Sequence, residues 1–238
     1  MEQVTYRTDP PKTGLENMEI DSACLKEAEE SSSPLTVVRF YQWSSATVSL
    51  GKHQTPDRAC DINFCLLHKL PIVHRPTGGR AVLHDNELTY SVVSNDPALF
   101  PLNDLMATYH VISQALQEGF RRFGISSEAA AGSKEAGRPR TTGKQSPCFS
   151  SPTRHELMSG GRKLAGSAQR RLRKSFLQHG SIPLSVDYDF MAAALGTSPQ
   201  RLRSQMIGVD EVINKPHEIS ELINCLEDGF RDVLVSNR

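Results

Sequence analysis

The sequence has no long hydrophobic run. No segment approaches the roughly 20 consecutive apolar residues that a membrane-spanning helix requires. The N-terminus also lacks the basic head and apolar stretch that mark a secretion signal. We therefore expect a cytoplasmic protein with no membrane partner.

An excess of charge of either sign is also missing. The 27 basic and 27 acidic side chains give a formal net charge of +0, so the overall field of the protein does not favour nucleic acid. The one local basic cluster, described below, has no interleaved aromatic residues of the kind that stack on bases. We expect no nucleic-acid partner.

Paired cysteine motifs are absent as well. The cysteines are five in number, have no C-x-x-C spacing and follow no secretion signal, so reduced thiols are expected rather than disulfides. They are Cys24, Cys60, Cys65, Cys148 and Cys225. The nearby histidines do not complete a recognised zinc spacing, and we predict no metal site.

Helical and strand patterns are both present. The pattern predicts helices over residues 17–28, 60–69, 102–123, 188–195 and 218–234. Runs rich in β-branched and aromatic residues predict a strand hairpin in TVVRFYQW and ATVSLG, and a second strand pair in RAVLHD and ELTYSVVS that turns at Asp85 and Asn86. A further hairpin is expected around Gly160 and Gly161, followed by a strand in SFLQHGSIPL.

Residues 129–147 differ in composition from the rest of the chain. They are small, polar and rich in glycine and proline, which predicts a flexible loop. No repeat and no clean linker divides the sequence. We therefore predict that residues 1–238 form one α+β domain.

The stretch RPTGGRAVLHDNELTYSVV contains two adjacent glycines, Gly78 and Gly79, between two strand-like runs. It matches neither the G-x-G-x-x-G dinucleotide fingerprint nor a phosphate-binding P-loop. Two interpretations remain from the residues alone. The glycines form a tight turn, or their backbone lies close against a ligand.

Three sequence blocks together resemble a known family. RPTGGRAVLHDNELTYSVV, the upstream GLENMEIDSACL and the downstream GRKLAGSAQRR...LQHGSIPL resemble the lipoate/octanoate-protein ligases and transferases, from about Tyr6 to about Leu184. The resemblance implies the biotin/lipoate protein ligase catalytic-domain fold: α+β, with a mixed, largely antiparallel central sheet flanked by helices. It also implies a tunnel for an eight-carbon acyl chain.

The resemblance assigns residues to the walls of that tunnel. One wall comprises Arg75, Thr77, Gly78, Gly79, Arg80 and His84, and the facing wall comprises Gly166, Ser167, Ala168 and Gln169. His84 and His179 are expected to hold neighbouring loops by hydrogen bonds rather than to act as general bases.

The segment CFSSPTRHEL resembles the cysteine block of the family's octanoyltransferases, which implies Cys148 as nucleophile and Lys163 as its activator. A thiol is only slightly ionised at neutral pH, and a nearby ammonium lowers its pKa. The implied reaction moves an octanoyl group from octanoyl-acyl carrier protein, through a cysteine thioester, to a lysine of a lipoyl-domain protein such as the glycine-cleavage H protein. It uses no cofactor.

Three alternatives remain open. An ATP-dependent lipoate-protein ligase would need ATP and Mg, but only about fifty residues follow GSIPL, where such ligases carry an additional small domain. An amidotransferase would move the octanoyl group between two lipoyl-domain proteins. A non-catalytic carrier-protein binder would use the tunnel and the surface without chemistry.

Basic residues gather around the last block: Arg162, Lys163, Arg170, Arg171, Arg173 and Lys174. They form either a solvated strand edge or a docking patch for the acidic carrier and lipoyl-domain proteins. In the docking hypothesis, Arg162, Arg170, Arg171, Arg173 and Lys174 meet the partner.

Overall fold

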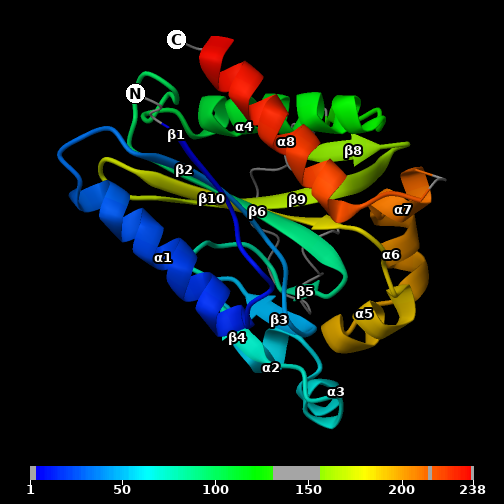
Figure 1. The fold of residues 1–238 in the computed structure, drawn as a ribbon. Helices are drawn as coiled ribbons and strands as arrows, with labels where there is room; N and C mark the ends of the chain where they lie inside the picture. The colour runs from blue at the N-terminus through cyan, green and yellow to red at the C-terminus, as the bar shows by residue number, and fades with distance from the viewer. Residues whose placement is uncertain (1–3, 131–155, 214–215, 237–238) are drawn as a thin grey trace.

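The structure is a computed structural model that describes residues 4–130, 156–213 and 216–236 (Figure 1). Its strands are β1 (Val4–Thr8), β2 (Thr36–Tyr41), β3 (Thr47–Leu50), β4 (Ile72–His74), β5 (Val82–His84), β6 (Glu87–Ser94), β7 (Glu128–Ala129), β8 (Leu157–Ser159), β9 (Arg162–Arg171) and β10 (Phe176–Pro183). Its helices are α1 (Gly14–Glu30), α2 (Pro56–Ala59), α3 (Ile62–Leu67), α4 (Leu105–Phe123), α5 (Tyr188–Leu195), α6 (Pro199–Gln205), α7 (Val209–Val212) and α8 (Ile219–Ser236).

The strands form two sheets. The large sheet has the order β1-β2-β6-β10-β9-β8-β7, and the small sheet has the order β4-β3-β5. In the large sheet β1 is parallel to β2, and each other pair of neighbours is antiparallel. This arrangement confirms the predicted α+β class with a largely antiparallel central sheet.

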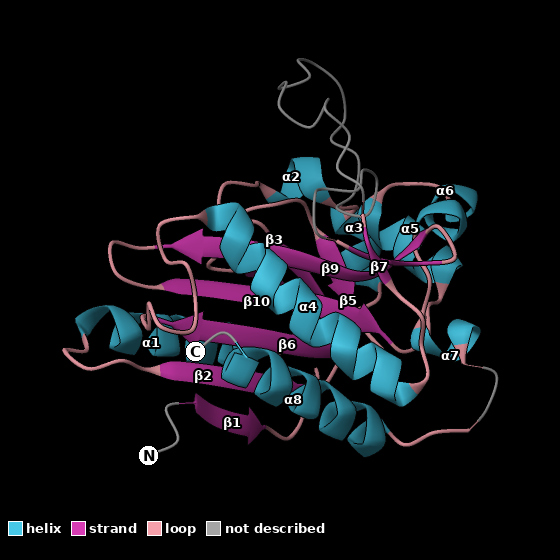
Figure 2. Cartoon of the chain, turned by 90° about the horizontal axis from the view of Figure 1, so that it is seen from above, coloured by secondary structure: helices cyan, strands magenta, loops and turns pink. Residues whose placement is uncertain are grey.

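Both faces of the large sheet are covered. Helices α4 and α8 lie side by side on one face, and α1 lies with the small sheet on the other (Figures 1 and 2). Every residue of the two central strands, β6 and β10, is therefore buried. No helix within residues 4–130, 156–213 and 216–236 is long and apolar enough to cross a membrane.

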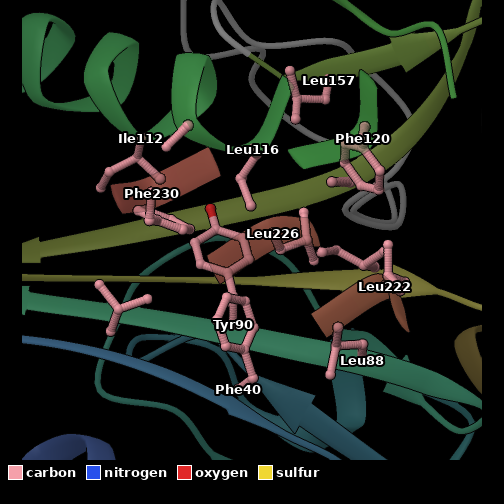
Figure 3. Close-up of a cluster of buried hydrophobic side chains, with 14 of the residues drawn as sticks. Phe40, Leu88, Tyr90, Ile112, Leu116, Phe120, Leu157, Leu222, Leu226 and Phe230 are labelled. Carbon is pink, nitrogen blue, oxygen red and sulfur yellow. The ribbon is translucent and has the colours of Figure 1, made fainter. Parts of the chain in front are cut away.

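The two faces of the large sheet carry different chemistry because successive strand residues point to opposite sides. On the α4 and α8 side, Leu88, Tyr90 and Val92 of β6 join the main hydrophobic core. Figure 3 shows Leu88 and Tyr90 beneath side chains of the two helices. On the opposite side, the alternate residues of β6 include Glu87 and Thr89, which are buried polar groups.

Local sequence signals fix the ends of the principal helices. α1 begins with a capping box, in which Glu16 N donates to Thr13 Oγ1 at 3.3 Å and Thr13 N donates to Glu16 at 2.9 Å. α4 begins at the cap residue Asp104 and ends at Gly124, whose φ of +95° is left-handed. These signals explain why the predicted helices over 17–28 and 102–123 are confirmed.

The hairpin predicted around Gly160 and Gly161 is also confirmed. β8 and β9 are antiparallel, and the two glycines have φ of +55° and +74°, as a two-residue turn with both central residues left-handed requires. The predicted strand in SFLQHGSIPL is β10, and the predicted helices over 188–195 and 218–234 are α5 and α8.

Two predicted strand pairings are wrong. TVVRFYQW and ATVSLG contain strands β2 and β3, but β2 pairs with β1 and β6, whereas β3 pairs with β4 and β5. RAVLHD and ELTYSVVS contain β5 and β6, which also belong to different sheets. In each case the connecting residues carry the chain from one sheet to the other, and turn-forming residues permit this path as readily as a hairpin.

Other differences are smaller. The helix expected over 60–69 is α3, which begins after the cap residue Asp61, and a separate short helix α2 precedes it. Strands β1 and β7 and helices α6 and α7 were not predicted. The loop predicted over 129–147 lies, beyond Ala130, outside the described residues.

Close contact between α4 and α8 depends on two glycines. An added Cβ at Gly119 would lie 2.6 Å from Leu226 Cα and 2.9 Å from Cys225 O, and one at Gly229 would collide with the backbone of Ala115 and Gly119. Backbone atoms cannot turn away as a flexible side chain can. The spacing of the two helices therefore has no room for a methyl group.

We expect Gly119→Ala to destabilise the protein by about 2 kcal/mol, the usual scale of overpacking in a core. In an unhindered helix, Gly→Ala instead raises the free energy of unfolding by up to about 1 kcal/mol. Urea unfolding measures the change, and Gln114→Ala at an exposed position of α4 is the control, expected to be near neutral. An unfolding free energy equal to or above wild type in Gly119→Ala would contradict the packing described here.

Candidate functional site

A cavity lies between the large sheet and the small sheet. The space between its lining residues is about 450 Å³, which includes space open to solvent. The lining comprises Met18, Tyr41, Trp43, Ser49, Arg75, Val82, His84, Thr89, Lys163, Gly166, Ser167, Ala168, His179, Gly180 and Ser181. We call the large-sheet side of this cavity the floor and the small-sheet side the roof.

The floor crosses four adjacent strands. Lys163 is on β9, Ser181 on β10, Thr89 on β6 and Tyr41 on β2. Because neighbouring strands are about 4.8 Å apart, the span from β9 to β2 is roughly 14 Å. At the β2 end, Met18 of α1 packs with Tyr41 and Trp43 in an apolar cluster. The cavity is therefore elongated, with an amine at one end and apolar side chains at the other.

The buried side chain of Arg75 bonds to the backbone of its own loop, the glycine loop (residues 75–80). The buried Arg75 guanidinium donates to Gly78 O at 2.8 Å, to Arg80 O at 2.7 Å and, on the small sheet, to Ser49 O at 3.1 Å. One guanidinium thus bonds to three backbone carbonyls. Arg75 therefore connects the glycine loop to the small sheet within the roof.

The two glycines of the loop differ in role. Gly79 has a left-handed φ of +94°, and its carbonyl lies so close to Gly51 that a Cβ on Gly51 could not be placed. A Cβ on Gly78, by contrast, would meet no atom within 4 Å. The left-handed turn therefore favours glycine at position 79, and the close approach of the two backbones requires glycine at position 51. The role of Gly79 in the turn is the first of the two interpretations left open by the sequence.

One buried histidine joins roof and floor near Trp43. His84 Nε2 is 2.7 Å from Ser49 Oγ in the roof, and His84 Nδ1 is 2.8 Å from Glu87 Oε1 in the floor. Glu87 also accepts from Ser181 Oγ at 2.5 Å. The Trp43 ring stacks on the imidazole, with 3.9 Å between ring centroids. This geometry agrees with the expected structural role of His84.

A second buried histidine makes the equivalent connection. His179 Nε2 is 2.7 Å from Thr77 Oγ1 in the glycine loop, and His179 Nδ1 is 2.9 Å from Asp21 Oδ2 on α1. Asp21 also accepts from Arg39 Nη1 at 2.9 Å and from the Tyr41 hydroxyl at 3.0 Å. Each of the two histidines is thus placed between a carboxylate and a hydroxyl.

Burial and hydrogen bonding set the charges in this network. Burial acts to raise the pKa of Asp21, but the hydrogen bond from His179 and the charge of Arg39 outweigh it, so the pKa lies below its ordinary value. Burial lowers the pKa of His179 below 6.5, against the opposing effect of Asp21. The network therefore contains an ionised Asp21 and a neutral His179 at neutral pH.

Lys163 forms a buried ion pair that was not predicted from the sequence. Its Nζ lies 2.5 Å from Glu156 Oε1, and the two side chains are 3% and 7% exposed. Glu156 precedes β8, and Lys163 is the second residue of β9, so the hairpin turn brings them together. An acidic residue seven positions before a lysine, across a predicted hairpin, was the available signal.

The structure places half of the predicted wall residues at the cavity. Arg75, His84, Gly166, Ser167 and Ala168 line it. The predicted wall residues that lie outside the lining are Thr77, Gly78, Gly79, Arg80 and Gln169.

The alternation of β9 explains the position of Gln169. Its amide donates to Gln178 Oε1 at 3.1 Å, and its carbonyl accepts from Arg171 at 3.0 Å, which also reaches Thr108 of α4. Gln169 thus lies on the α4 side of the sheet, opposite the cavity. Thr77 is fully buried outside the lining, and its hydroxyl contacts His179.

The predicted basic docking cluster is divided along β9. Lys163 is buried, and Arg162 at the start of the strand is 3.2 Å from Glu211. Arg170 and Arg171 end the strand, and Arg173 and Lys174 follow in the turn to β10. Because a strand rises about 3.3 Å per residue, roughly 30 Å separates Arg162 from Arg171. The five docking residues therefore do not form one patch.

Cys148 lies outside the described residues. The described cysteines are Cys24, Cys60, Cys65 and Cys225, and all have free thiols. Burial, followed by the neighbouring Cys65, raises the pKa of Cys60 to about 12. The role predicted for Cys148 and its relation to Lys163 stay predictions.

Comparison with known proteins identifies the relatives of this chain. The family model for the lipoyl protein ligase A/B catalytic domain matches residues 13–231. The octanoyltransferase LipM of Brevibacillus brevis is 38% identical over 240 residues, which cover 97% of this chain and 86% of that protein. LipM of Bacillus subtilis is 37% identical over 225 residues, which cover 90% of this chain and 80% of that protein.

Solved structures agree on the fold. A bi-partite lipoate protein ligase from Thermoplasma acidophilum matches with a TM-score of 0.78 at 18% identity, over 99% of this chain and 85% of that one. At this identity the similarity concerns the fold alone. The fold and the family that the three sequence blocks implied are both confirmed.

We expect Glu156→Gln to destabilise the protein by about 3 kcal/mol, because removal of one partner leaves the other charge buried without its counter-ion. The double variant Glu156→Gln/Lys163→Met is expected to lose less than the sum of the two single losses. Chemical unfolding of all three variants measures the coupling.

The control is Glu30→Gln, which removes one partner of an exposed pair with Lys26. A change of at most about 0.5 kcal/mol is expected there. Additive losses at Glu156 and Lys163 would show that the two charges do not depend on each other.

Proposed function

Because the chain belongs to the lipoyl protein ligase A/B catalytic-domain family, we propose that it transfers an octanoyl group from octanoyl-acyl carrier protein to a lysine of a lipoyl-domain protein. Octanoyl transfer in protein lipoylation is the activity that its curated octanoyltransferase relatives support. The glycine-cleavage H protein is a suitable acceptor. We further propose that the transfer passes through a thioester on Cys148.

The observation that carries this proposal is the elongated cavity with Lys163 at one end and the apolar cluster of Met18, Tyr41 and Trp43 at the other. Seven C–C bonds of about 1.5 Å each give an eight-carbon chain a length of at most about 11 Å. This length is shorter than the roughly 14 Å from β9 to β2 across which the lining residues are spread. The acyl tail would lie toward Trp43, with its carbonyl carbon near Lys163.

The proposed chemistry has two steps. The Cys148 thiolate attacks the carbonyl carbon of the donor thioester; a new C–S bond forms, the old C–S bond breaks, and the carrier leaves as a thiol after it takes up a proton. The neutral amine of the acceptor lysine then attacks the same carbon. An amide bond forms, the bond to Cys148 breaks, and the proton lost by the amine returns to the sulfur.

Lys163 supplies a positive charge for the first step in this proposal. An ammonium near a thiol favours the thiolate and stabilises negative charge that develops on the carbonyl oxygen. Glu156 holds that ammonium in the buried site. No ATP enters either step, and we propose that the reaction needs no cofactor.

The ATP-dependent ligase stays the principal alternative, because the solved neighbour from T. acidophilum is a ligase. A ligase would modify the acceptor from a free acid with ATP and Mg. An amidotransferase would take its octanoyl group from a second lipoyl-domain protein instead.

We place the proposed reaction in the cytoplasm, where a catalytic thiol stays reduced.

Mixing the protein with octanoyl-acyl carrier protein, without ATP, is expected to add one octanoyl group to the wild type and none to Cys148→Ser. Intact-mass spectrometry measures the adduct. Cys60→Ser is the matched control and is expected to keep the adduct, because the Cys60 thiol has a pKa of about 12 and is poorly ionised.

The same assay separates the alternatives. Modification of the acceptor only from free acid with Mg-ATP would identify a ligase. Octanoyl transfer only from an octanoylated lipoyl-domain donor would identify an amidotransferase. No adduct and no transfer from any donor would leave a carrier-protein binder.

A further inference from the structure

We propose that His179 is a positioning residue that binds the glycine loop to the floor through Thr77 and so keeps the roof of the cavity in place. The expected effect on octanoyl transfer rests on the proposed function. The expected effect on the position of the glycine loop rests only on the contacts of His179. Three separate parts of the chain meet at this imidazole: α1 through Asp21, β10 through His179 itself, and the glycine loop through Thr77.

The protonation of His179 follows from its partners. Asp21 accepts hydrogen bonds from Arg39 and Tyr41, so its carboxylate is ionised and can only accept from His179 as well. The proton of the neutral imidazole is therefore on Nδ1, facing Asp21. Nε2 then presents its lone pair, and the Thr77 hydroxyl donates to it at 2.7 Å. Asp21 thus selects the tautomer that can accept from the loop.

The order carboxylate, imidazole, hydroxyl is that of a hydrolytic triad, but the burial of Thr77 argues for a structural role. A nucleophile must reach the substrate. The Thr77 side chain is 0% exposed and is not part of the cavity lining. Its hydroxyl therefore connects two parts of the protein.

The loop has two different anchors. The bonds from Arg75 to Gly78, Arg80 and Ser49 lie within the roof. The bond from Thr77 to His179 runs from the roof to the floor. Loss of the Thr77 bond leaves the loop folded against the small sheet but releases it from the large sheet. The consequence falls on the width of the cavity, and hence on the binding of the acyl chain more than on the chemical step.

Acidification opposes this arrangement. The groups that face His179 are Asp21 from α1, Arg75 from the glycine loop and His84 from β5, with Arg39 of β2 bonded to Asp21. Burial, Arg75 and His84 all lower the pKa of His179, and Asp21 alone raises it. Because the folded pKa lies below the unfolded value, the stability that the neutral imidazole contributes is complete above about pH 6.5 and is lost as the pH falls below it.

The test compares Thr77→Val with Thr77→Ser. Valine keeps the shape of threonine without the hydroxyl and leaves a buried imidazole nitrogen without a donor, whereas serine keeps the hydroxyl. For Thr77→Val we expect the KM for octanoyl-acyl carrier protein to rise about tenfold, with kcat within about twofold. Thr77→Ser is expected to stay within about twofold of wild type in both constants. Thr55→Val, at an exposed threonine without a capping bond, is the matched control.

Two measurements do not depend on octanoyl transfer. Nitrogen-15 spectra of the wild-type imidazoles are expected to show His179 as the Nδ1–H tautomer near neutral pH, with protonation only below pH 6.5. Amide hydrogen exchange of Gly78, Gly79 and Arg80 is expected to be faster in Thr77→Val than in Thr77→Ser. If the protein lacks octanoyl transfer, the proposed function fails and these two results still test the inference.

Opposite results overturn it. A proton on Nε2 of His179 at neutral pH would remove the acceptor that the proposal requires. Unchanged loop exchange in Thr77→Val would show that other contacts hold the loop. Equal kinetic losses in Thr77→Val and Thr77→Ser would show that the hydroxyl does not carry the effect.

Discussion

A buried carboxylate organises the cavity side of this protein. Asp21 is 0% exposed, and an ionised group at such a depth is costly unless it is paired and fully hydrogen-bonded. Arg39, Tyr41 and His179 supply the partners. α1 is thereby fixed to β2 and β10 by polar contacts as well as by packing. The placement of α1 determines where Met18 closes against Tyr41 and Trp43.

Successive strand residues point to opposite faces, so the large sheet can form the core on one face and line the cavity on the other. One face of β2, β6 and β10 carries apolar residues and forms the main core with α4 and α8. The other face carries Arg39, Glu87 and His179. Arg39 and His179 bond to Asp21 of α1, and Glu87 bonds to His84 of the roof. Stability comes chiefly from the first face. The second face can therefore hold a cavity without reducing the core.

Sequence patterns predicted the elements better than their partners. The long helices and the hairpin at Gly160 and Gly161 followed from periodicity, caps and turn residues, which are local signals. The assignment of β3 and β5 to a second sheet did not, because a corner between sheets and a hairpin use the same turn residues. The family resemblance supplied the fold and the region of the site.

The contacts within the site were beyond local reasoning. Asp21 and His179 are 158 positions apart, and Thr77 and His179 are 102 positions apart. The resemblance assigned Thr77 to the cavity wall, but Thr77 is not among the lining residues and its hydroxyl contacts His179. The side of β9 on which Gln169 falls depends on strand register, which the sequence alone did not fix.

The buried acidic and basic side chains around the cavity suit different tasks. The carboxylates Asp21 and Glu87 accept several hydrogen bonds each, and such saturated groups hold structure in place. Lys163 lines the cavity, and its amine is paired with the buried carboxylate of Glu156. Glu156 thus anchors this ammonium in a buried site. In the proposed reaction the ammonium would contact a thiolate or a developing oxyanion. It would not need to lose bound water at that step, because its burial in the folded protein has already removed that water. The pairing with Glu156 offsets the unfavourable free energy of burying the ammonium when the protein folds, before any substrate binds.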